Sequence, residues 1–150
     1  MSHRVHVNDK LAPEAFELLN SNPSIEATME HYDAGTLKEK VKDFDALIVR
    51  SATKVTKEII ENGEKLKVIG RAGIGLDNID VATAKEKGIK VLNTPGASAI
   101  SVAELTIGLI LAASRHIARG TYGLKHGKWE KKALEGHELY GKTLGIIGFG

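Results

Sequence analysis

Residues 68–81 read VIGRAGIGLDNIDV, in which a short apolar run leads into closely spaced glycines and then into a helical pattern. A strand that feeds a glycine turn ahead of a helix is typical of a βαβ unit. Gly73 and Gly75 can adopt positive φ and leave backbone N–H groups uncovered, which would suit a carboxylate or a phosphate. The spacing alone fits equally well a tight turn that binds nothing.

The alternation of short apolar runs and helical patterns continues on both sides of this turn and is typical of parallel strands joined by crossover helices. The expected strands are Val5–Val7, Ile25–Met29, Ala46–Val49, Leu66–Ile69 and Ile89–Leu92. The expected helices are Pro13–Leu19, one that starts at the Thr-x-x-Glu capping box of Thr36, Thr56–Asn62 closed by Gly63, and Asp80–Lys87 closed by Gly88. The first ninety or so residues therefore should form one small α/β domain.

A domain boundary is expected at Asn93–Gly96, where proline and glycine together impose a turn. A second capping box, which starts at Ser101, then opens a helix that is apolar nearly all round through Leu111. One protein surface cannot account for all of this apolar area, so we expect the helix to be buried between domains or at a subunit interface. Residues 119–134 form a more polar helical or loop region that carries Trp129.

The last residues, 142–150, read KTLGIIGFG, an apolar run that leads into Gly-x-Gly. A dinucleotide-binding βαβ unit begins in this way, with a strand that feeds a turn whose backbone can approach a pyrophosphate. Gly148 and Gly150 are therefore candidate cofactor-binding residues. The third glycine and the ribose-binding acid of the full motif are absent, and the alternative is a strand that ends in a glycine turn.

A second candidate site is the segment Val49–Thr53, which directly follows another expected strand. Ligands gather at the carboxyl ends of strands in an open parallel sheet, so Arg50 and the glycine turn should face one crevice. A guanidinium can donate two bonds at once to a phosphate or a carboxylate. Arg71 favours the same kind of ligand, although it could equally cap a carbonyl, and Arg50 alone could be an ordinary surface residue.

The amino-acid composition limits the kinds of binding partner that we expect. The 21 basic and 19 acidic residues leave a net charge of +2, which gives no electrostatic reason to expect nucleic acid or an anionic membrane. The absence of cysteine excludes disulfides, Cys-ligated zinc and a thiol nucleophile here, and fits a reducing compartment. The histidines lack ligand-like spacing, so we expect no metal site. Without a signal-peptide pattern or an apolar run long enough to span a bilayer, we expect a soluble, cytoplasmic protein.

Five stretches together resemble the D-3-phosphoglycerate dehydrogenases, a branch of the D-isomer-specific 2-hydroxyacid dehydrogenases. They are LIVRSATKVT (47–56), VIGRAGIGLDNIDV (68–81), NTPGASAISVAELTIGLIL (93–111), GKWEKK (127–132) and GKTLGIIGFG (141–150). They occur in that family's order, and the likeness runs from near residue 1 to the end. The Arg-Ser-x-Thr segment favours the phosphoglycerate branch.

The resemblance implies an α/β fold with a flavodoxin-like or Rossmann-like substrate domain at residues 1–93. Residues 94–150 would open a doubly wound NAD-binding domain. The substrate-binding residues that it implies are Arg50, Ser51, Arg71, Gly73, Ile74 and Gly75. The glycine turn would present backbone amides to the substrate carboxylate, and Ile74, Gly148 and Gly150 would lie against NAD. Several family members carry a hydroxyl where this sequence has Ile74.

The activity that the resemblance implies is NAD-dependent oxidation of 3-phosphoglycerate to 3-phosphohydroxypyruvate, the first step of serine biosynthesis. In this family the catalytic arginine, glutamate and histidine follow beyond Gly150, so we expect no catalytic residue here and no activity from this N-terminal half alone. The helix around 101–117 would form a homodimer or homotetramer. Alternatives are another D-2-hydroxyacid dehydrogenase, such as a glyoxylate or hydroxypyruvate reductase, and a non-catalytic dimerisation or ligand-binding fragment.

Overall fold

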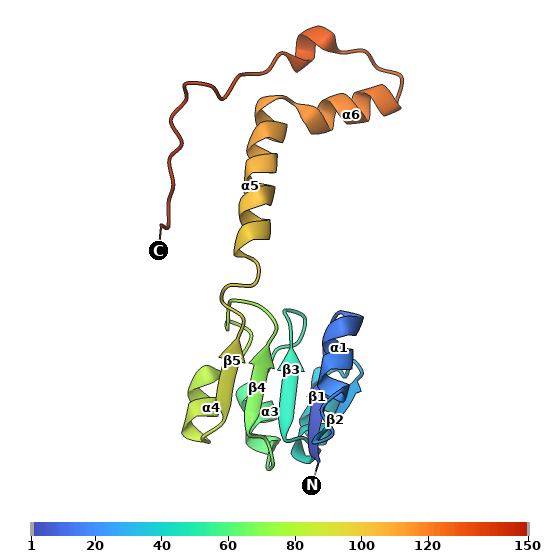
Figure 1. Ribbon diagram of the computed structural model, residues 1–150, viewed down its shortest axis with the longest axis vertical. Helices are drawn as coiled ribbons and strands as arrows, with labels where there is room; N and C mark the ends of the chain where they lie inside the picture. The colour runs from blue at the N-terminus through green and yellow to red at the C-terminus, as the bar shows by residue number, and fades with distance from the viewer. Residues whose placement is uncertain (1, 150) are drawn as a thin grey trace. The chain divides into compact units, whose positions relative to one another are not determined.

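The computed structural model describes residues 2–149 and divides the chain into two compact units, Met1–Ser98 and Ala99–Gly150. The first unit alternates strands and helices (Figure 1). In chain order it contains β1 (His3–Val7), α1 (Pro13–Asn20), β2 (Ile25–Met29), α2 (Ala34–Lys40), the 3₁₀ helix η1 (Val41–Asp43), β3 (Ala46–Val49), α3 (Lys57–Asn62), β4 (Val68–Arg71), α4 (Val81–Glu86) and β5 (Lys90–Asn93).

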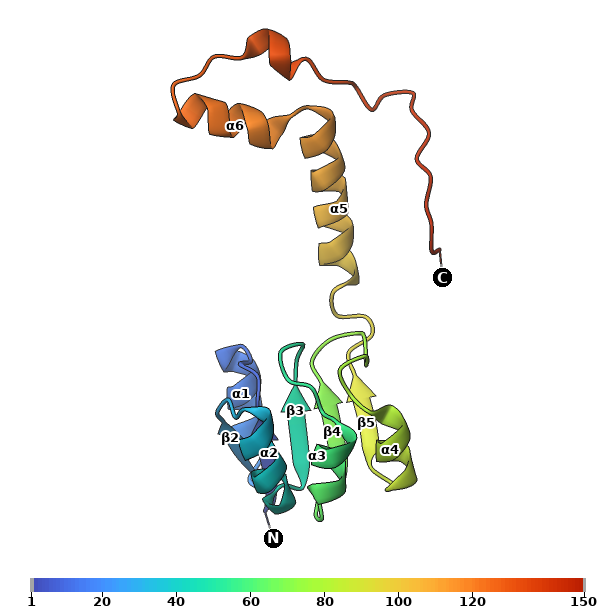
Figure 2. The ribbon, with the colours of Figure 1, turned by 180° about the vertical axis from the view of Figure 1, so that it is seen from behind.

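The five strands form one sheet in the order β2-β1-β3-β4-β5, and every neighbouring pair is parallel. This is the flavodoxin-like order, so the predicted α/β class is confirmed. Helices α2, α3 and α4 cover one face of the sheet, and α1 lies on the other (Figures 1 and 2). The chain reverses its direction of winding between β1 and β3, which is where this class of sheet forms its ligand crevice.

The hydrophobic core lies between the sheet and the helices that cover it. Side chains alternate between the two faces of a strand, and on β3 Leu47 and Val49 are fully buried whereas Ala46 and Ile48 are only half-buried. The same core cluster includes Leu37, Val41, Val55, Ile59, Ile60, Leu66, Ile69, Ile79, Ala84 and Ile89. Because β3 and β4 are anchored in this core, the residues that follow them begin from fixed positions.

The strand bounds agree closely with those expected from the sequence, with one informative difference. β2 and β3 have the predicted bounds, β1 begins two residues earlier at His3, and β5 is shifted by one residue. β4 was expected at Leu66–Ile69 but spans Val68–Arg71, because Leu66 closes a turn by donating its N–H to the Gly63 carbonyl (3.2 Å). Gly70 and Arg71 therefore belong to the strand and not to the turn.

Two helix ends are built differently from the prediction. α2 begins at Ala34, ahead of the expected box at Thr36, because the Asp33 carboxylate caps the helix by accepting from the Thr36 N–H (2.8 Å). Gly63 was expected to be left-handed, but its φ is −77°, and a Cβ there would lie 2.9 Å from the Leu66 Cβ. The close approach of Leu66 explains this glycine. Gly88 has the predicted positive φ, 72°.

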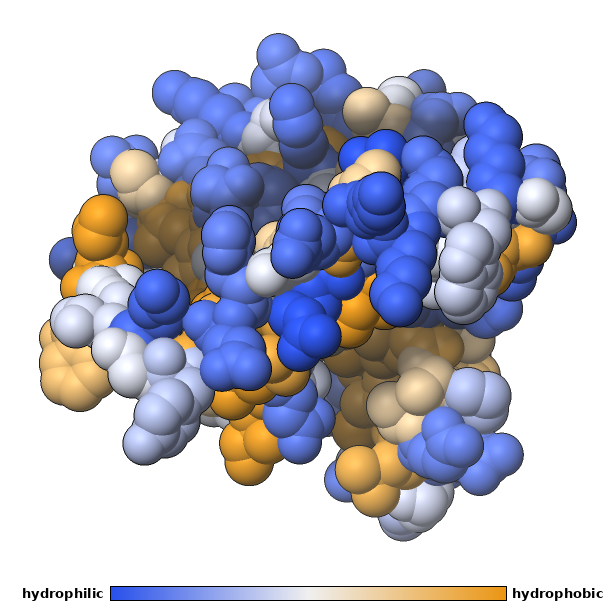
Figure 3. Space-filling model, turned by 90° about the horizontal axis from the view of Figure 1, so that it is seen from above, coloured by the Kyte–Doolittle hydropathy of each residue, from blue (hydrophilic) through white to orange (hydrophobic). Residues whose placement is uncertain are grey.

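The second unit contains α5 (Ala99–Ser114), α6 (Ile117–Lys125) and the 3₁₀ helix η2 (Lys131–Leu134). α5 begins at Ala99, two residues before the expected start at Ser101. The expected strand within 142–148 is not formed, since no strand elsewhere in the described part of this unit can supply ladder hydrogen bonds. Figure 3 shows hydrophobic side chains at the surface among hydrophilic ones. Those exposed along α5 include Ile100, Val102, Leu105, Ile107, Leu109 and Leu111.

Within residues 2–149, no single helix has the length and apolar character needed to cross a membrane. Only α5 and α6 counted together reach that threshold, and a bend of 66° separates them.

A histidine on β1, His6, is fully buried in the first unit. The His6 ring stacks between the rings of Tyr32 and Phe44, with centroid distances of 4.6 Å to each. Its ring nitrogens hydrogen-bond to the Thr28 hydroxyl (3.0 Å) and to the Asn8 side-chain oxygen (3.2 Å). Burial lowers the pKa of His6 below its ordinary value of 6.5, and the Asn8 hydrogen bond and Glu30 only partly oppose this effect.

We expect the free energy of unfolding to fall as the pH decreases below about 6.5, the ordinary value for histidine. In that range the unfolded chain takes up a proton that His6 in the folded chain resists, so protonation favours unfolding; above it, both states are neutral. The measurement is the urea midpoint between pH 8 and pH 5.5. His6→Gln should flatten this dependence and His3→Gln, at an exposed position, should not. An unchanged slope in His6→Gln would assign the dependence to other groups.

Candidate functional site

The segments that follow β1, β3, β4 and β5 meet at the carboxyl edge of the sheet. Asp9 follows β1, Arg50–Thr53 follows β3, and the glycine turn 73–75 follows β4. In the register between β3 and β4, Val49 pairs with Arg71, so Arg50 and Arg71 lie at the ends of neighbouring strands. The structure thus brings the two arginines and the glycine turn to one edge, as the rule for open parallel sheets predicts.

A buried carboxylate holds the segment that carries Arg50. The side chain of Asp9 accepts hydrogen bonds from the Arg50 N–H (2.6 Å), the Thr53 N–H (3.1 Å) and the Thr53 hydroxyl (2.7 Å). Burial raises the pKa of Asp9, but the hydrogen bonds from Thr53 and Arg50 outweigh burial, and the net result is a lowered pKa. Asp9 is therefore ionised at neutral pH, and it accepts from main-chain groups without blocking the Arg50 guanidinium.

An asparagine after the glycine turn holds the same segment from the other side. The side-chain amide of Asn78 donates to the Arg50 carbonyl (2.6 Å) and to the Thr53 carbonyl (2.7 Å). The N–H of Val55 donates to the Asn78 carbonyl (2.8 Å), which adds a main-chain link. The loops after β3 and β4 are thus joined to each other.

The glycine turn is held by Asn93, the last residue of β5, and by Thr94, which follows it. The Thr94 N–H donates to the Gly73 carbonyl (2.9 Å), and the Asn93 side-chain amide donates to the Ile74 carbonyl (2.7 Å). As glycines, Gly73 and Gly75 could adopt positive φ, but neither does. Their role is steric instead, since a Cβ at Gly73 would overlap the Arg71 guanidinium and a Cβ at Gly75 would lie 2.8 Å from an Asp77 carboxylate oxygen.

The two arginines differ in how they are held. Arg71 is half-buried, and its Nε is buried without a hydrogen-bond partner among the described residues. Arg50 is exposed and makes a long hydrogen bond from Nη1 to the Lys10 carbonyl (3.3 Å). Ser51 and Ile74 are also exposed, beside these groups in the sequence. Both guanidinium groups therefore keep donors for an anionic ligand.

The predicted cofactor residues at the end of the chain lie in the second unit. Gly148 has a φ of 81°, and nothing lies within 4 Å of where a Cβ would be. A positive φ and bare backbone fit a turn that must approach a pyrophosphate closely. Gly150 lies outside the described residues.

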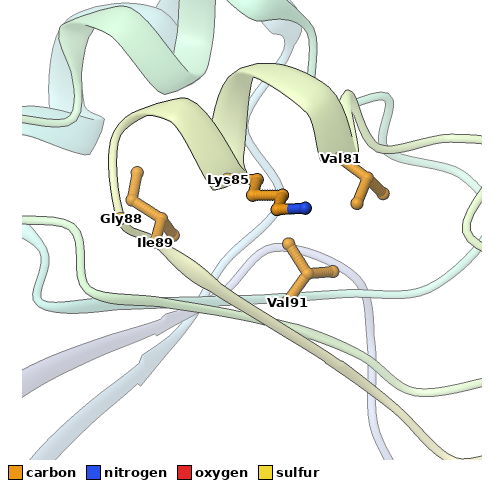
Figure 4. Close-up of a pocket in the computed structure, with 5 residues that line it drawn as sticks. All are labelled: Val81, Lys85, Gly88, Ile89 and Val91. Atoms are coloured by element: carbon orange, nitrogen blue, oxygen red, sulfur yellow. The ribbon is translucent and has the colours of Figure 1, made fainter.

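A cavity of about 330 Å³ lies between α4 and β5. Figure 4 shows the side chains of Val81 and Lys85 from α4 and of Val91 from β5 around it. It contains none of the predicted site residues, and its one charged group is the Lys85 ammonium. Across residues 2–149, no group of three His, Cys, Asp or Glu side chains is arranged to hold a metal ion.

Sequence reasoning missed Asp9, Asn78 and Asn93. Asp9 follows a predicted strand and could have been found by the rule that selected Arg50, because it too stands at a carboxyl end. Asn78 and Asn93 give only a weak signal, since asparagine near a turn commonly caps its own backbone. Here, instead, Asn78 donates to the segment after β3 and Asn93 donates to the glycine turn after β4.

Comparison with known proteins identifies the family of this chain. Residues 5–144 match the family described as D-isomer specific 2-hydroxyacid dehydrogenase, catalytic domain. The chain is 66% identical over 148 residues to a hydroxypyruvate reductase of Thermotoga maritima, covering 99% of this chain and 48% of that protein. It is 54% identical over 147 residues to a D-3-phosphoglycerate dehydrogenase of Methanocaldococcus jannaschii, covering 98% of this chain and 28% of that protein.

Among solved structures, the chain resembles NAD⁺-bound 3-phosphoglycerate dehydrogenase of Entamoeba histolytica. The TM-score is 0.69 at 33% identity, covering 93% of this chain and 44% of that one. The chain thus spans less than half the length of each of these relatives. By the family match over most of its length, this chain belongs to the D-isomer specific 2-hydroxyacid dehydrogenase family.

Proposed function

We propose that this chain supplies the substrate-binding domain, and the beginning of the cofactor domain, of an NAD-dependent dehydrogenase that oxidises 3-phosphoglycerate to 3-phosphohydroxypyruvate. The observation that carries the proposal is the pair of guanidinium groups, Arg50 and Arg71, at the ends of neighbouring parallel strands beside the glycine turn. A substrate with a carboxylate at one end and a phosphate at the other has two anionic groups for this pair.

In this proposal the chain's own residues bind and orient the substrate. Arg71 and the glycine turn hold the carboxylate, while Arg50 and the Ser51 hydroxyl hold the phosphate. Gly148 would help to hold NAD, which when bound would supply the acceptor for the hydride of the substrate's hydroxyl-bearing carbon. The hydroxyl proton goes to a base in the further part of the protein, which the relatives have and residues 1–150 do not cover.

Support for the cofactor and the substrate comes from the relatives. A D-3-phosphoglycerate dehydrogenase is 54% identical, and the similar Entamoeba structure contains NAD⁺. A second candidate is reduction of hydroxypyruvate, which the 66% identity to a hydroxypyruvate reductase favours. The two candidates differ by the phosphate group, so the residue that meets the phosphate can separate them.

Replacing Arg50 with Ala in the full-length protein should raise KM for 3-phosphoglycerate about ten- to a hundredfold, the value of one charge-assisted hydrogen-bonded contact. KM for unphosphorylated D-glycerate should change much less, because that substrate lacks the group Arg50 binds. Steady-state kinetics with both substrates make the comparison.

The control is Arg4→Ala, since Arg4 is exposed on β1 and lies over the Phe44 ring, near the amino end of the strand. It should leave both KM values unchanged. An equal effect of Arg50→Ala on the two substrates would favour the hydroxypyruvate reductase candidate.

We also propose that the protein acts in serine biosynthesis in the cytoplasm and assembles into a homodimer or homotetramer through residues 101–117. The exposed apolar side chains of α5 support an interface with a second copy. The absence of cysteine supports a reducing compartment.

A further inference from the structure

We propose that Asn78 is a positioning residue that fixes Arg50 relative to the glycine turn, so that the guanidinium groups of Arg50 and Arg71 contact the same substrate molecule. This inference rests on the proposed function and adds a residue to its site. It concerns a side chain that touches neither substrate group and acts through the main chain of the Arg50–Thr53 segment.

The first step is that one side chain reaches two carbonyls of the same segment. Asn78 donates to the carbonyls of Arg50 (2.6 Å) and Thr53 (2.7 Å), so its two amide N–H groups are used at both ends of the segment. Two short hydrogen bonds from one planar amide fix both the position and the orientation of the peptide groups that they meet.

The second step is that the N–H groups of Arg50 and Thr53 donate to Asp9, which follows β1. The main-chain N–H groups of this segment therefore donate to Asp9, after β1, and its carbonyls accept from Asn78, in the loop after β4. A segment held from both sides presents its side chain from a preorganised backbone.

The third step is that Asn78 stands in register with this segment. Val55 and Ile79 form an isolated parallel bridge, and the N–H of Asp80 donates to the Val55 carbonyl (3.0 Å). Asn78 also lies three positions beyond Gly75 in the loop after β4. The distance between the arginine after β3 and the glycine turn after β4 is thereby set by short covalent and hydrogen-bonded links.

The fourth step concerns the side-chain oxygen of Asn78, which is buried and has no hydrogen-bond partner among the described residues. A buried polar atom without a partner costs stability, so its presence calls for a compensating role. The two donors on the same amide supply that role. Replacing them by a carboxylate would place negative oxygens against two carbonyl oxygens.

The test uses Asn78→Ala and Asn78→Asp in the full-length protein with 3-phosphoglycerate. We expect KM to rise about tenfold in Asn78→Ala and about a hundredfold in Asn78→Asp, with kcat within about twofold of the wild type in the alanine variant. The matched control is Asn62→Ala, which removes the same kind of amide-to-carbonyl bond, from Asn62 to the Glu58 carbonyl (2.7 Å), at the end of α3. It should leave KM unchanged.

A double-mutant cycle separates positioning from a general loss of structure. If Asn78 acts through Arg50, Asn78→Ala should have little further effect on KM in an Arg50→Ala background. Additive effects of the two substitutions would overturn the proposal, as would an Asn78→Asp variant with the KM of the wild type.

Hydrogen exchange distinguishes failure of this proposal from failure of the proposed function. A wild-type protein that turns over no 2-hydroxy acid would contradict the proposed function alone. The amides of Arg50 and Thr53 should still exchange at least severalfold faster in Asn78→Ala than in the wild type, and at the wild-type rate in Asn62→Ala. Unchanged exchange at these amides in Asn78→Ala would overturn the positioning role whatever the activity.

Discussion

Gly73→Ala is expected to lower kcat/KM of the full-length protein about a hundredfold while leaving the fold intact. A Cβ at this position would overlap the guanidinium of Arg71, so that side chain would have to move. The cost to stability should be small, because the atoms in the way are the far end of a flexible side chain. The cost to substrate binding should be large, because Arg71 loses the place from which it reaches the glycine turn.

Two measurements check this expectation. Thermal unfolding should show similar midpoints for Gly73→Ala and the wild type, and Gly96→Ala, where nothing lies within 4 Å of the added Cβ, should match the wild type in both stability and kinetics. In an Arg71→Ala background, Gly73→Ala should cost little more activity, since the group it displaces is already gone. Full activity in Gly73→Ala would show that Arg71 does not contact the substrate from its observed position.

Leu47→Ala is expected to lower the free energy of unfolding by about 2–5 kcal/mol. Leu47 is fully buried on β3, which lies between β1 and β4 in the middle of the sheet. Its replacement removes apolar contacts and leaves a cavity that the neighbouring strands cannot close without breaking their ladders. Urea unfolding followed by circular dichroism gives the change directly.

Leu18→Ala is the matched control, because Leu18 on α1 is 73% exposed. It should change the free energy of unfolding by less than about 0.5 kcal/mol. Similar losses in the two variants would mean that the sheet core contributes less than its burial indicates.

The sequence predicted the fold well because the fold follows from short-range patterns. β2 and β3 match their expected bounds, and the glycine turn falls between a strand and a helix as the apolar runs require. Parallel buried strands read as continuous apolar runs, which a single sequence displays plainly. The prediction of a strand within 142–148 was wrong, because a strand also needs a neighbouring strand to bond to, and no local sequence pattern supplies one.

The candidate site was predicted only in part because its supports are long-range. Arg50, Arg71 and the glycine turn could be named from position after a strand. The bonds from Asp9 to Arg50 and Thr53 join residues 41 and 44 positions apart, and no periodicity encodes them. Gly73 could be singled out from the sequence, but the Arg71 guanidinium that a Cβ there would meet could not, because a sequence shows where a Cβ is missing and not which atoms lie beside it.

The order of strands in the sheet has a consequence for the time course of folding. Val5 on β1 pairs with Ala46 on β3. The segment between these two strands contains α1, β2 and α2, so the pairing joins residues that are far apart in the sequence. Pairings between residues far apart in the chain lose much chain entropy before they gain contacts, which makes parallel sheets of this kind slow to form. Asp9 and Arg50 meet beyond the end of that ladder, so the edge that carries the candidate site forms in the same step that closes the sheet.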